Sequence, residues 1–179
     1  MERFYFKTTV SIILSLFLLS CSNNKTVKIV TQWSGREIIM PDNIYFKSFG
    51  KDTICDHLLS KSFKILTYVD PKTCASCQLG LFQWKAFIDL CEQLQLDVSF
   101  LFIINSTDYQ EFEYHLKVDD FSYPVIYDPD DRFNKFNDFP KELVFRTFLL
   151  DIDNKVLIIG SPFKNNKVLN MYINTIKQV

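Results

Sequence analysis

The chain has 179 residues, of which 47% are hydrophobic and 16% aromatic, and its formal net charge at pH 7 is −1. Its 18 phenylalanines beside only four glycines are typical of a packed globular protein and exclude a low-complexity or disordered chain. The nearly neutral charge and the lack of a basic stripe exclude a nucleic-acid-binding protein, so no nucleic acid partner is expected.

The N-terminus has the pattern of a secretory signal, which makes residues 1–20 a removable leader. Two basic residues precede an apolar core over residues 10–19, and the small Ser20 comes directly before Cys21. This core is shorter than the roughly 20 apolar residues that a permanent transmembrane helix needs. We therefore expect cleavage before Cys21.

The letters LLSC at residues 18–21 resemble the lipobox of bacterial lipoproteins. In that family the signal is cut before the cysteine and the cysteine thiol carries the lipid, so the resemblance implies lipidation of Cys21. Several acyl chains anchor a protein far more firmly than one. The resemblance thus implies a protein that is stably tethered to a membrane through Cys21.

Residues 21–61 are predicted to form a short tether and an N-terminal β extension. A turn at Ser34 and Gly35 and another at Gly50 separate short runs of β-branched and aromatic residues. The strands predicted from these runs cover residues 26–33, 36–41 and 43–49.

Residues 62–179 are predicted to form one domain in which strands and helices alternate. The run over residues 97–105 is almost continuously apolar, as in a strand covered on both faces of a sheet. After Cys74 the apolar residues recur at helical spacing, through Trp84 to Cys91. The predicted elements are strands over residues 63–70, 97–105 and 123–128, helices from Cys74, over 106–120 and over 165–179, and a hairpin over 143–160 that turns at Asp153 and Asn154.

This order of elements, with two cysteines two residues apart at the start of the first helix, resembles the thioredoxin-like superfamily. Within it, the chain is similar to the TlpA/ResA-like thiol–disulfide lipoproteins of Bacteroidetes. The resemblance implies an α/β fold of three layers, a central mixed sheet flanked by helices, with an N-terminal β extension. The segments that carry it are ILTYVDPKTCASCQ, FSYPVIYDPDDRF and RTFLLDIDNKVL.

Cys74 and Cys77 are the candidate catalytic residues. A cysteine at a helix N-terminus faces unpaired N–H groups and the positive end of the helix dipole, which favour its thiolate. Cys74 precedes the first turn, so we predict that it is the attacking thiolate. Cys77 shares a face with Leu81 and Trp84, so we predict that it is the resolving cysteine.

Phe145, Arg146 and Thr147 are the candidate substrate-docking loop, because they match the loop that presents backbone to the substrate in the family. The family has a cis-proline where Phe145 stands, and a cis bond without proline costs about 2.5–4 kcal/mol, so this bond is predicted to be trans. Two interpretations of Arg146 remain open: a cation that helps to hold a thiolate, or a solvated arginine at a strand end. Tyr68 occupies the position of the buried acid of cytosolic thioredoxins.

The other reactive residue types favour structural roles. Cys91 is predicted to be a core residue and Cys55 a free thiol. Neither His57 nor His115 is placed near the cysteine pair by its sequence context, so no metal and no cofactor is expected. The acidic residues 128–133 lack the spacing of a calcium loop and are predicted to form a turn and helix cap.

Two functions are compatible with this sequence. The first is a membrane-anchored extracytoplasmic thiol–disulfide oxidoreductase that exchanges electrons with envelope protein thiols and disulfides through Cys74 and Cys77. The second is a redox-inactive thioredoxin-like lipoprotein that serves as a binding or assembly scaffold, with the pair as a structural disulfide. The helix-terminal pair favours the first, and Phe145 in place of proline favours the second. Either protein is expected in the envelope of a Gram-negative-type bacterium, lipid-anchored and facing the periplasm, where disulfides persist.

Overall fold

The computed structural model describes residues 25–72 and 79–178. Cys21, Cys74 and Cys77 lie outside these ranges, so the predictions made for them are not described by the structure. The chain divides after Ser34 into two compact units, and the second unit contains the sheet and the helices named below. Among the described residues, no helix is both long and apolar enough to cross a membrane.

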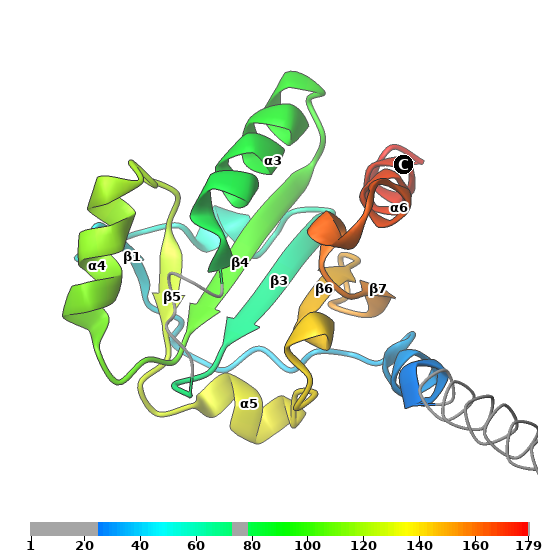
Figure 1. Ribbon diagram of the computed structural model, residues 1–179, viewed down its shortest axis with the longest axis horizontal. Helices are drawn as coiled ribbons and strands as arrows, with labels where there is room; N and C mark the ends of the chain where they lie inside the picture. The colour runs from blue at the N-terminus through cyan, green and yellow to red at the C-terminus, as the bar shows by residue number, and fades with distance from the viewer. Residues whose placement is uncertain (1–24, 73–78, 179) are drawn as a thin grey trace, which may run out of the picture. The chain divides into compact units, whose positions relative to one another are not determined.

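A mixed seven-stranded sheet is the centre of the second unit, in the order β2-β1-β5-β4-β3-β6-β7 (Figure 1). The β3–β4 and β4–β5 pairs are parallel, and the other neighbouring strands are antiparallel. The strands are β1 (Phe46–Ser48), β2 (Lys51–Thr53), β3 (Phe63–Val69), β4 (Val98–Ile104), β5 (Val125–Tyr127), β6 (Thr147–Leu150) and β7 (Val156–Ile159).

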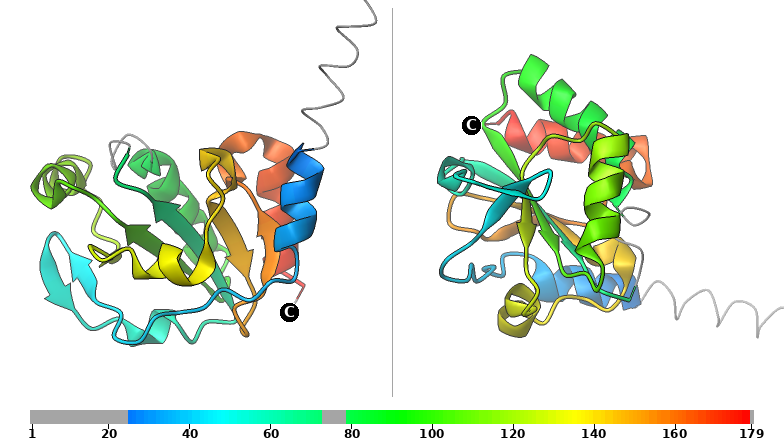
Figure 2. Two further views of the ribbon diagram at one scale, coloured as in Figure 1. Left: turned by 90° about the horizontal axis from the view of Figure 1, so that it is seen from below. Right: turned by 90° about the vertical axis from the view of Figure 1, so that its left-hand side faces the viewer.

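Helices cover both faces of this sheet. Figure 2 shows α3, α4 and α6 on one face, with α5 on the other. The helices are α3 (Leu81–Gln93), α4 (Tyr109–Val118), α5 (Arg132–Asn137) and α6 (Asn166–Ile176), with short 3-10 helices η1 (Asp56–Leu58), η2 (Leu143–Phe145) and η3 (Pro162–Lys164). The predicted three-layer α/β architecture is therefore confirmed.

The core between the sheet and α3 is largely aromatic. Trp84 on α3 packs edge-on against Phe102 of β4 and Phe163 of η3, with ring centroids 5.2 and 4.7 Å apart. On α6, the buried hydroxyl of Tyr172 donates to the carbonyl of Gly160 at 2.8 Å. These contacts confirm the predicted inner face of α3 and the predicted packing of the C-terminal helix against the sheet.

Residues 25–33 are helical, so the strand predicted over residues 26–33 is wrong. The amide of Ser34 donates to the carbonyl of Val30 at 2.9 Å and continues the helical hydrogen bonding at its C-terminal end. Ile29 and Trp33 are four residues apart, which is helical spacing. The strand prediction gave too much weight to the β-branched residues. Their preference for strands depends on context, and here the helical spacing of the apolar residues was the better indication.

The strand predicted over residues 36–41 is also wrong, since only Glu37 forms an isolated bridge, with Lys155. The side chain of Asn137 accepts from the amide of Ile39 at 2.8 Å and donates to its carbonyl at 2.9 Å. This side chain takes the place of a neighbouring strand, so the segment is extended without continuing the sheet.

The β1–β2 hairpin and the start of α5 follow local rules of turn and cap chemistry. Phe49 and Gly50 both have positive φ, at 49° and 78°, which is the requirement of a two-residue type I′ turn. Asp128 accepts from the amides of Arg132 and Phe133 at 3.0 and 2.9 Å. The prediction of a helix cap in the acidic segment is thus confirmed, whereas the polar β2 was not predicted.

We predict that Phe102→Ala lowers the free energy of unfolding by about 3–5 kcal/mol, because it empties a buried site among aromatic rings. Phe102 is fully buried, whereas Phe82 on α3 is 82% exposed. The matched control Phe82→Ala should change stability by less than about 0.5 kcal/mol. Urea unfolding of the two variants measures both values, and equal losses would show that the β4 core is wrongly placed.

Candidate functional site

The described residues that flank the cysteine pair are the turn after β3 and the start of α3. Pro71 and Lys72 form the turn, and Leu79 is helical. Gly80 then adopts φ 60°, and α3 begins at Leu81. A single uninterrupted helix from Cys74 to Cys91 is therefore wrong, because a left-handed residue breaks the helical path at Gly80.

Leu79 and the end of β3 line a cavity of about 290 Å³. Its lining joins four segments that are distant in sequence: the end of β3, the start of α3, the loop before β6 and the segment around η3. The side chains that line it include Tyr68, Leu79, Trp84, Arg146, Thr147 and Phe163. Two residues of the predicted docking loop, Arg146 and Thr147, thus line the same cavity as Leu79, which directly follows residues 73–78.

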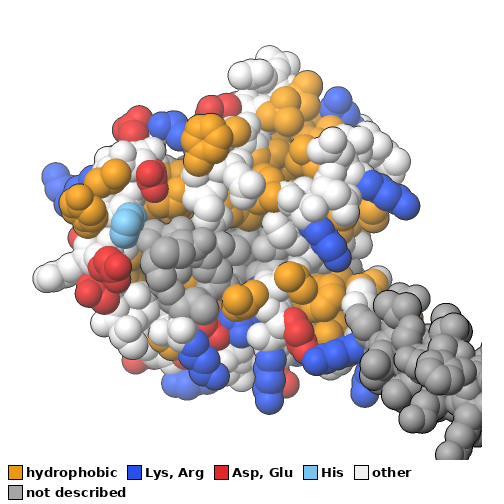
Figure 3. Space-filling view, in the orientation of Figure 1, with side chains coloured by type: hydrophobic (Ala, Val, Ile, Leu, Met, Phe, Trp, Pro, Cys, Tyr) orange, Lys and Arg blue, Asp and Glu red, His pale blue; other side chains and the backbone are white. Residues whose placement is uncertain are grey.

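The third residue of the predicted docking loop, Phe145, does not line this cavity. It is 9% exposed and ends η2, while its neighbours Leu143 and Val144 are 46% and 56% exposed. None of the described peptide bonds is cis, so the bond before Phe145 is trans, as expected. On the face of the molecule seen in Figure 3, hydrophobic side chains lie among charged ones.

Arg146 is buried and held on several sides. Its Nε donates to the carbonyl of Pro140 at 2.8 Å, and its Nη2 donates to the carbonyl of Lys141 at 3.0 Å. Its Nη1 lies 2.7 Å from Oδ2 of Asp70, in an ion pair without hydrogen-bond alignment. The interpretation of Arg146 as a solvated arginine is therefore wrong, because the fold encloses the side chain and supplies its partners.

Asp70 links the same arginine to the turn that precedes the cysteine segment. Its Oδ1 accepts from the amide of Lys72 at 3.1 Å, and its Oδ2 faces Arg146. Nothing in the sequence pattern paired these two residues. The one sequence feature that could have indicated the pair is an acidic residue directly after β3 and a basic residue directly before β6. These two positions become neighbours once the strands pair antiparallel.

Tyr68 stands in the position predicted to match a buried acid, but it is a neutral donor. Its hydroxyl donates to Oδ1 of Asp131 at 2.6 Å, and its ring stacks on Phe139 with centroids 4.8 Å apart. Burial, followed by the hydrogen bond to Asp131, raises the pKa of Tyr68 well above its usual value. Tyr68 therefore stays protonated at physiological pH and supplies no carboxyl to a proton relay.

The two described cysteines line a different cavity, of about 410 Å³, beside η1 and the C-terminal half of α3. Cys55 and Cys91 are both free and buried, which confirms the free thiol predicted for Cys55 and the core position predicted for Cys91. Burial raises the pKa of the Cys91 thiol to about 12, so it is a poor nucleophile at neutral pH. The described residues contain no cluster of three or more side chains suited to a metal ion.

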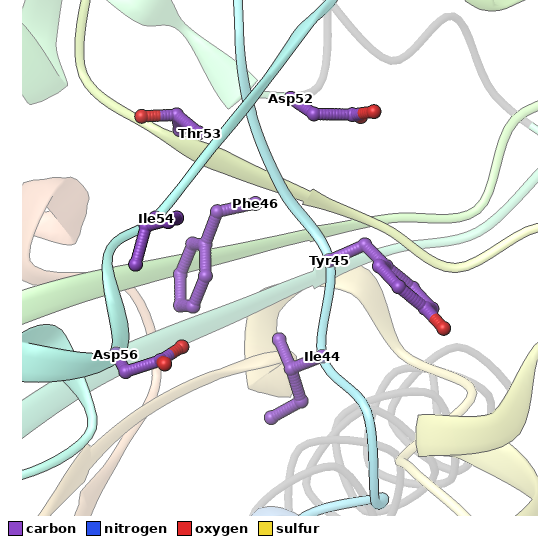
Figure 4. A pocket seen from close by; sticks show the side chains of 7 residues that line it. All are labelled: Ile44, Tyr45, Phe46, Asp52, Thr53, Ile54 and Asp56. Atoms are coloured by element: carbon purple, nitrogen blue, oxygen red, sulfur yellow. The ribbon is translucent and has the colours of Figure 1, made fainter.

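A groove of about 650 Å³ lies on the β1–β2 hairpin, and no thiol lines it. Figure 4 shows Ile44, Phe46, Ile54 and Asp56 around it. In the sheet, β5 and β4 separate this hairpin from β3. The groove is therefore not part of the candidate redox site.

No protein-family model matches the sequence, and no curated protein matches it. The structure is similar to the thioredoxin domain of a thiol-disulfide oxidoreductase from Bacteroides vulgatus, with a TM-score of 0.60 and 9% identity, covering 80% of this chain and 97% of that one. It is similar to peroxidoxin BcpB from Mycobacterium tuberculosis, with a TM-score of 0.58 and 17% identity, covering 82% of this chain and 97% of that one.

A cysteine-to-serine variant of peroxiredoxin Q from Xanthomonas campestris has a TM-score of 0.52 and 15% identity, covering 75% of this chain and 88% of that one. These likenesses concern the arrangement of the backbone, which agrees with the mixed sheet and its flanking helices. The chain therefore has the thioredoxin-like fold that its sequence predicted.

Proposed function

We propose that this chain is a membrane-anchored extracytoplasmic thiol–disulfide oxidoreductase that acts through Cys74 and Cys77. The observation that carries the proposal is the cavity between β3, α3 and the loop before β6, which is lined by Leu79, the residue that directly follows residues 73–78. The thioredoxin-like fold supports it, because the cysteine pair lies in the sequence between β3 and α3, and residues of both elements line that cavity. The oxidoreductase from Bacteroides vulgatus has the same general fold.

The chemistry is a two-step exchange without a cofactor. The Cys74 thiolate attacks one sulfur of a client disulfide, forms a mixed disulfide and releases the first client thiolate. The Cys77 thiolate then attacks the Cys74 sulfur and releases the second client thiolate. The client gains two electrons and the pair becomes a disulfide; the same steps in reverse oxidise a client dithiol.

The client is proposed to dock along the loop that contains Phe145, Arg146 and Thr147. Leu143 and Val144 present apolar surface beside the cavity, while Phe145 is buried and supports the loop from within. The partners are envelope proteins that carry exposed thiols or disulfides. The lipid at Cys21 would hold the site at the membrane, on the periplasmic side.

A redox-inactive scaffold is the second candidate, and one observation favours it. The charge of Arg146 is matched by Asp70, so this arginine offers no free charge to a thiolate. A redox titration of the cysteine pair separates the two functions. A reduction potential of about −270 to −120 mV supports exchange, and one below about −300 mV supports a structural disulfide.

We predict that Cys77→Ser accumulates mixed disulfides with envelope proteins, because the bond made by Cys74 can no longer be displaced from within. Cys74→Ser should trap far fewer, since the remaining thiol is expected to lie under the helix start. Non-reducing gels of membrane fractions, probed for this protein, measure both. Equal capture by the two variants would contradict the assigned roles.

We predict that alkylation of the reduced protein at mildly acidic pH labels Cys74 before Cys91. Cys91 is 2% exposed and has a pKa of about 12, so it stays protonated and covered. Mass spectrometry of the labelled peptides gives the order, and labelling in denaturant shows that every thiol is available. If the native protein labels Cys74 no faster than Cys91, the oxidoreductase proposal fails.

We predict that Cys21→Ala moves the protein from the membrane to the soluble fraction or leaves it unprocessed. The reason is that Cys21 supplies the only thiol proposed to carry the acyl chains. Fractionation and intact mass are the measurements, with Cys55→Ala as the matched cysteine control. A Cys21→Ala protein that retains the wild-type lipid mass would refute the anchor.

A further inference from the structure

A buried ion pair joins the C-terminal end of β3 to the loop before β6. Asp70 and Arg146 are each 8% exposed, and their charged atoms lie 2.7 Å apart. Such a pair is often no more stable than apolar side chains of similar volume, because both charges lose their hydration on burial. A contribution to the free energy of folding therefore does not by itself explain why the protein has this ion pair.

Arg146 shapes the loop in which it lies. Its Nε and Nη2 donate to the successive carbonyls of Pro140 and Lys141, so the guanidinium closes residues 140–146 into a compact turn. The planar, fixed arrangement of its donors suits this kind of multiple contact. Within the loop, the amide of Phe145 donates to the carbonyl of Glu142 at 3.0 Å.

Asp70 attaches that compact loop to the segment that leads to the cysteines. One carboxylate oxygen accepts from the amide of Lys72, and the other faces Arg146. Beside the pair, the amide of Tyr68 donates to the carbonyl of Arg146 at 3.0 Å. The same carboxylate thus holds the turn after β3 and the loop before β6.

We propose that Asp70 and Arg146 are positioning residues that hold the loop over residues 140–147 against the turn at Pro71 and Lys72 for a protein client. The proposal rests on the proposed function of Cys74 and Cys77. A protein disulfide needs the loop, because its backbone must lie along the loop while its sulfur meets Cys74. A small disulfide meets only the cysteine and does not need the loop.

The test is the double variant Asp70→Leu/Arg146→Met, which replaces the pair by apolar side chains and leaves no unpaired buried charge. With insulin as the protein disulfide, the KM should rise about tenfold, because the loop is no longer held in place. With bis(2-hydroxyethyl) disulfide, the rate should change by less than about twofold. An unchanged insulin KM in the folded double variant overturns the proposal.

A matched control removes an ion pair at the other end of β3. Lys61 and Asp97 lie 2.8 Å apart, before the starts of β3 and β4. The double variant Lys61→Met/Asp97→Asn should leave both the insulin KM and the small-disulfide rate at wild-type values. If it raises the insulin KM as much as the first variant does, the effect is a general loss of stability and the proposal is overturned.

Hydrogen exchange separates the positioning role from the redox function. The amides of Phe145 and Arg146 should exchange about tenfold faster in the Asp70→Leu/Arg146→Met variant, while those of β4 keep their rates. If the wild type reduces neither insulin nor the small disulfide, the proposed redox function fails, and faster loop exchange still supports the pair as the loop's attachment. Unchanged loop exchange overturns the pair's role whatever the activity.

Arg146→Lys provides a second variant if the double variant does not fold. The lysine keeps the positive charge opposite Asp70 but lacks the donors that reach Pro140 and Lys141. Its insulin KM should lie between the wild-type value and the tenfold rise, with the small-disulfide rate unchanged. A wild-type insulin KM in Arg146→Lys overturns the claim that the guanidinium shapes the docking loop.

Discussion

The rest of the structure depends on the pairing of β3 on both of its sides. Phe63–Val69 pairs in parallel with Val98–Ile104 over its whole length, and Lys64–Thr67 pairs antiparallel with β6. All seven residues of β3 are buried, so each backbone polar group has to find its partner inside the protein. This strand therefore sets the positions of its neighbours and of the helices that cover the two faces.

The two ends of β3 handle their polar side chains differently. Near the first end, the amine of Lys64 reaches the carbonyls of Lys61 and Ile152 at 3.3 and 3.1 Å, and burial lowers the pKa of this amine. At the other end, Tyr68 and Asp70 contact Asp131 and Arg146. The end that precedes residues 73–78 thus holds a buried polar network, whereas near the first end the Lys64 amine reaches the edge of the core and the ion pair of Lys61 and Asp97 is exposed.

This polar network determines the charge and the attachment of the loop before β6. Arg146 is neutralised by Asp70, so in the proposed mechanism the acidity of Cys74 would come from the helix end and not from this cation. The hydroxyls of Thr67 and Thr147 lie 3.3 Å apart and add a further polar contact between β3 and β6. The loop before β6 is therefore attached to β3 by side chains as well as by the ladder of backbone hydrogen bonds.

The sequence by itself determined the elements whose apolar pattern is long and regular. β3, β4 and α6 are such elements, because burial on one or both faces leaves a clear period in the residues. Only the tertiary structure decided the irregular parts. Asn137 replaces a neighbouring strand for Ile39, and Asp70 meets Arg146 because β3 and β6 lie side by side. These contacts join residues far apart in the chain, so no local sequence pattern predicts them. They form only when the sheet has brought the two segments together.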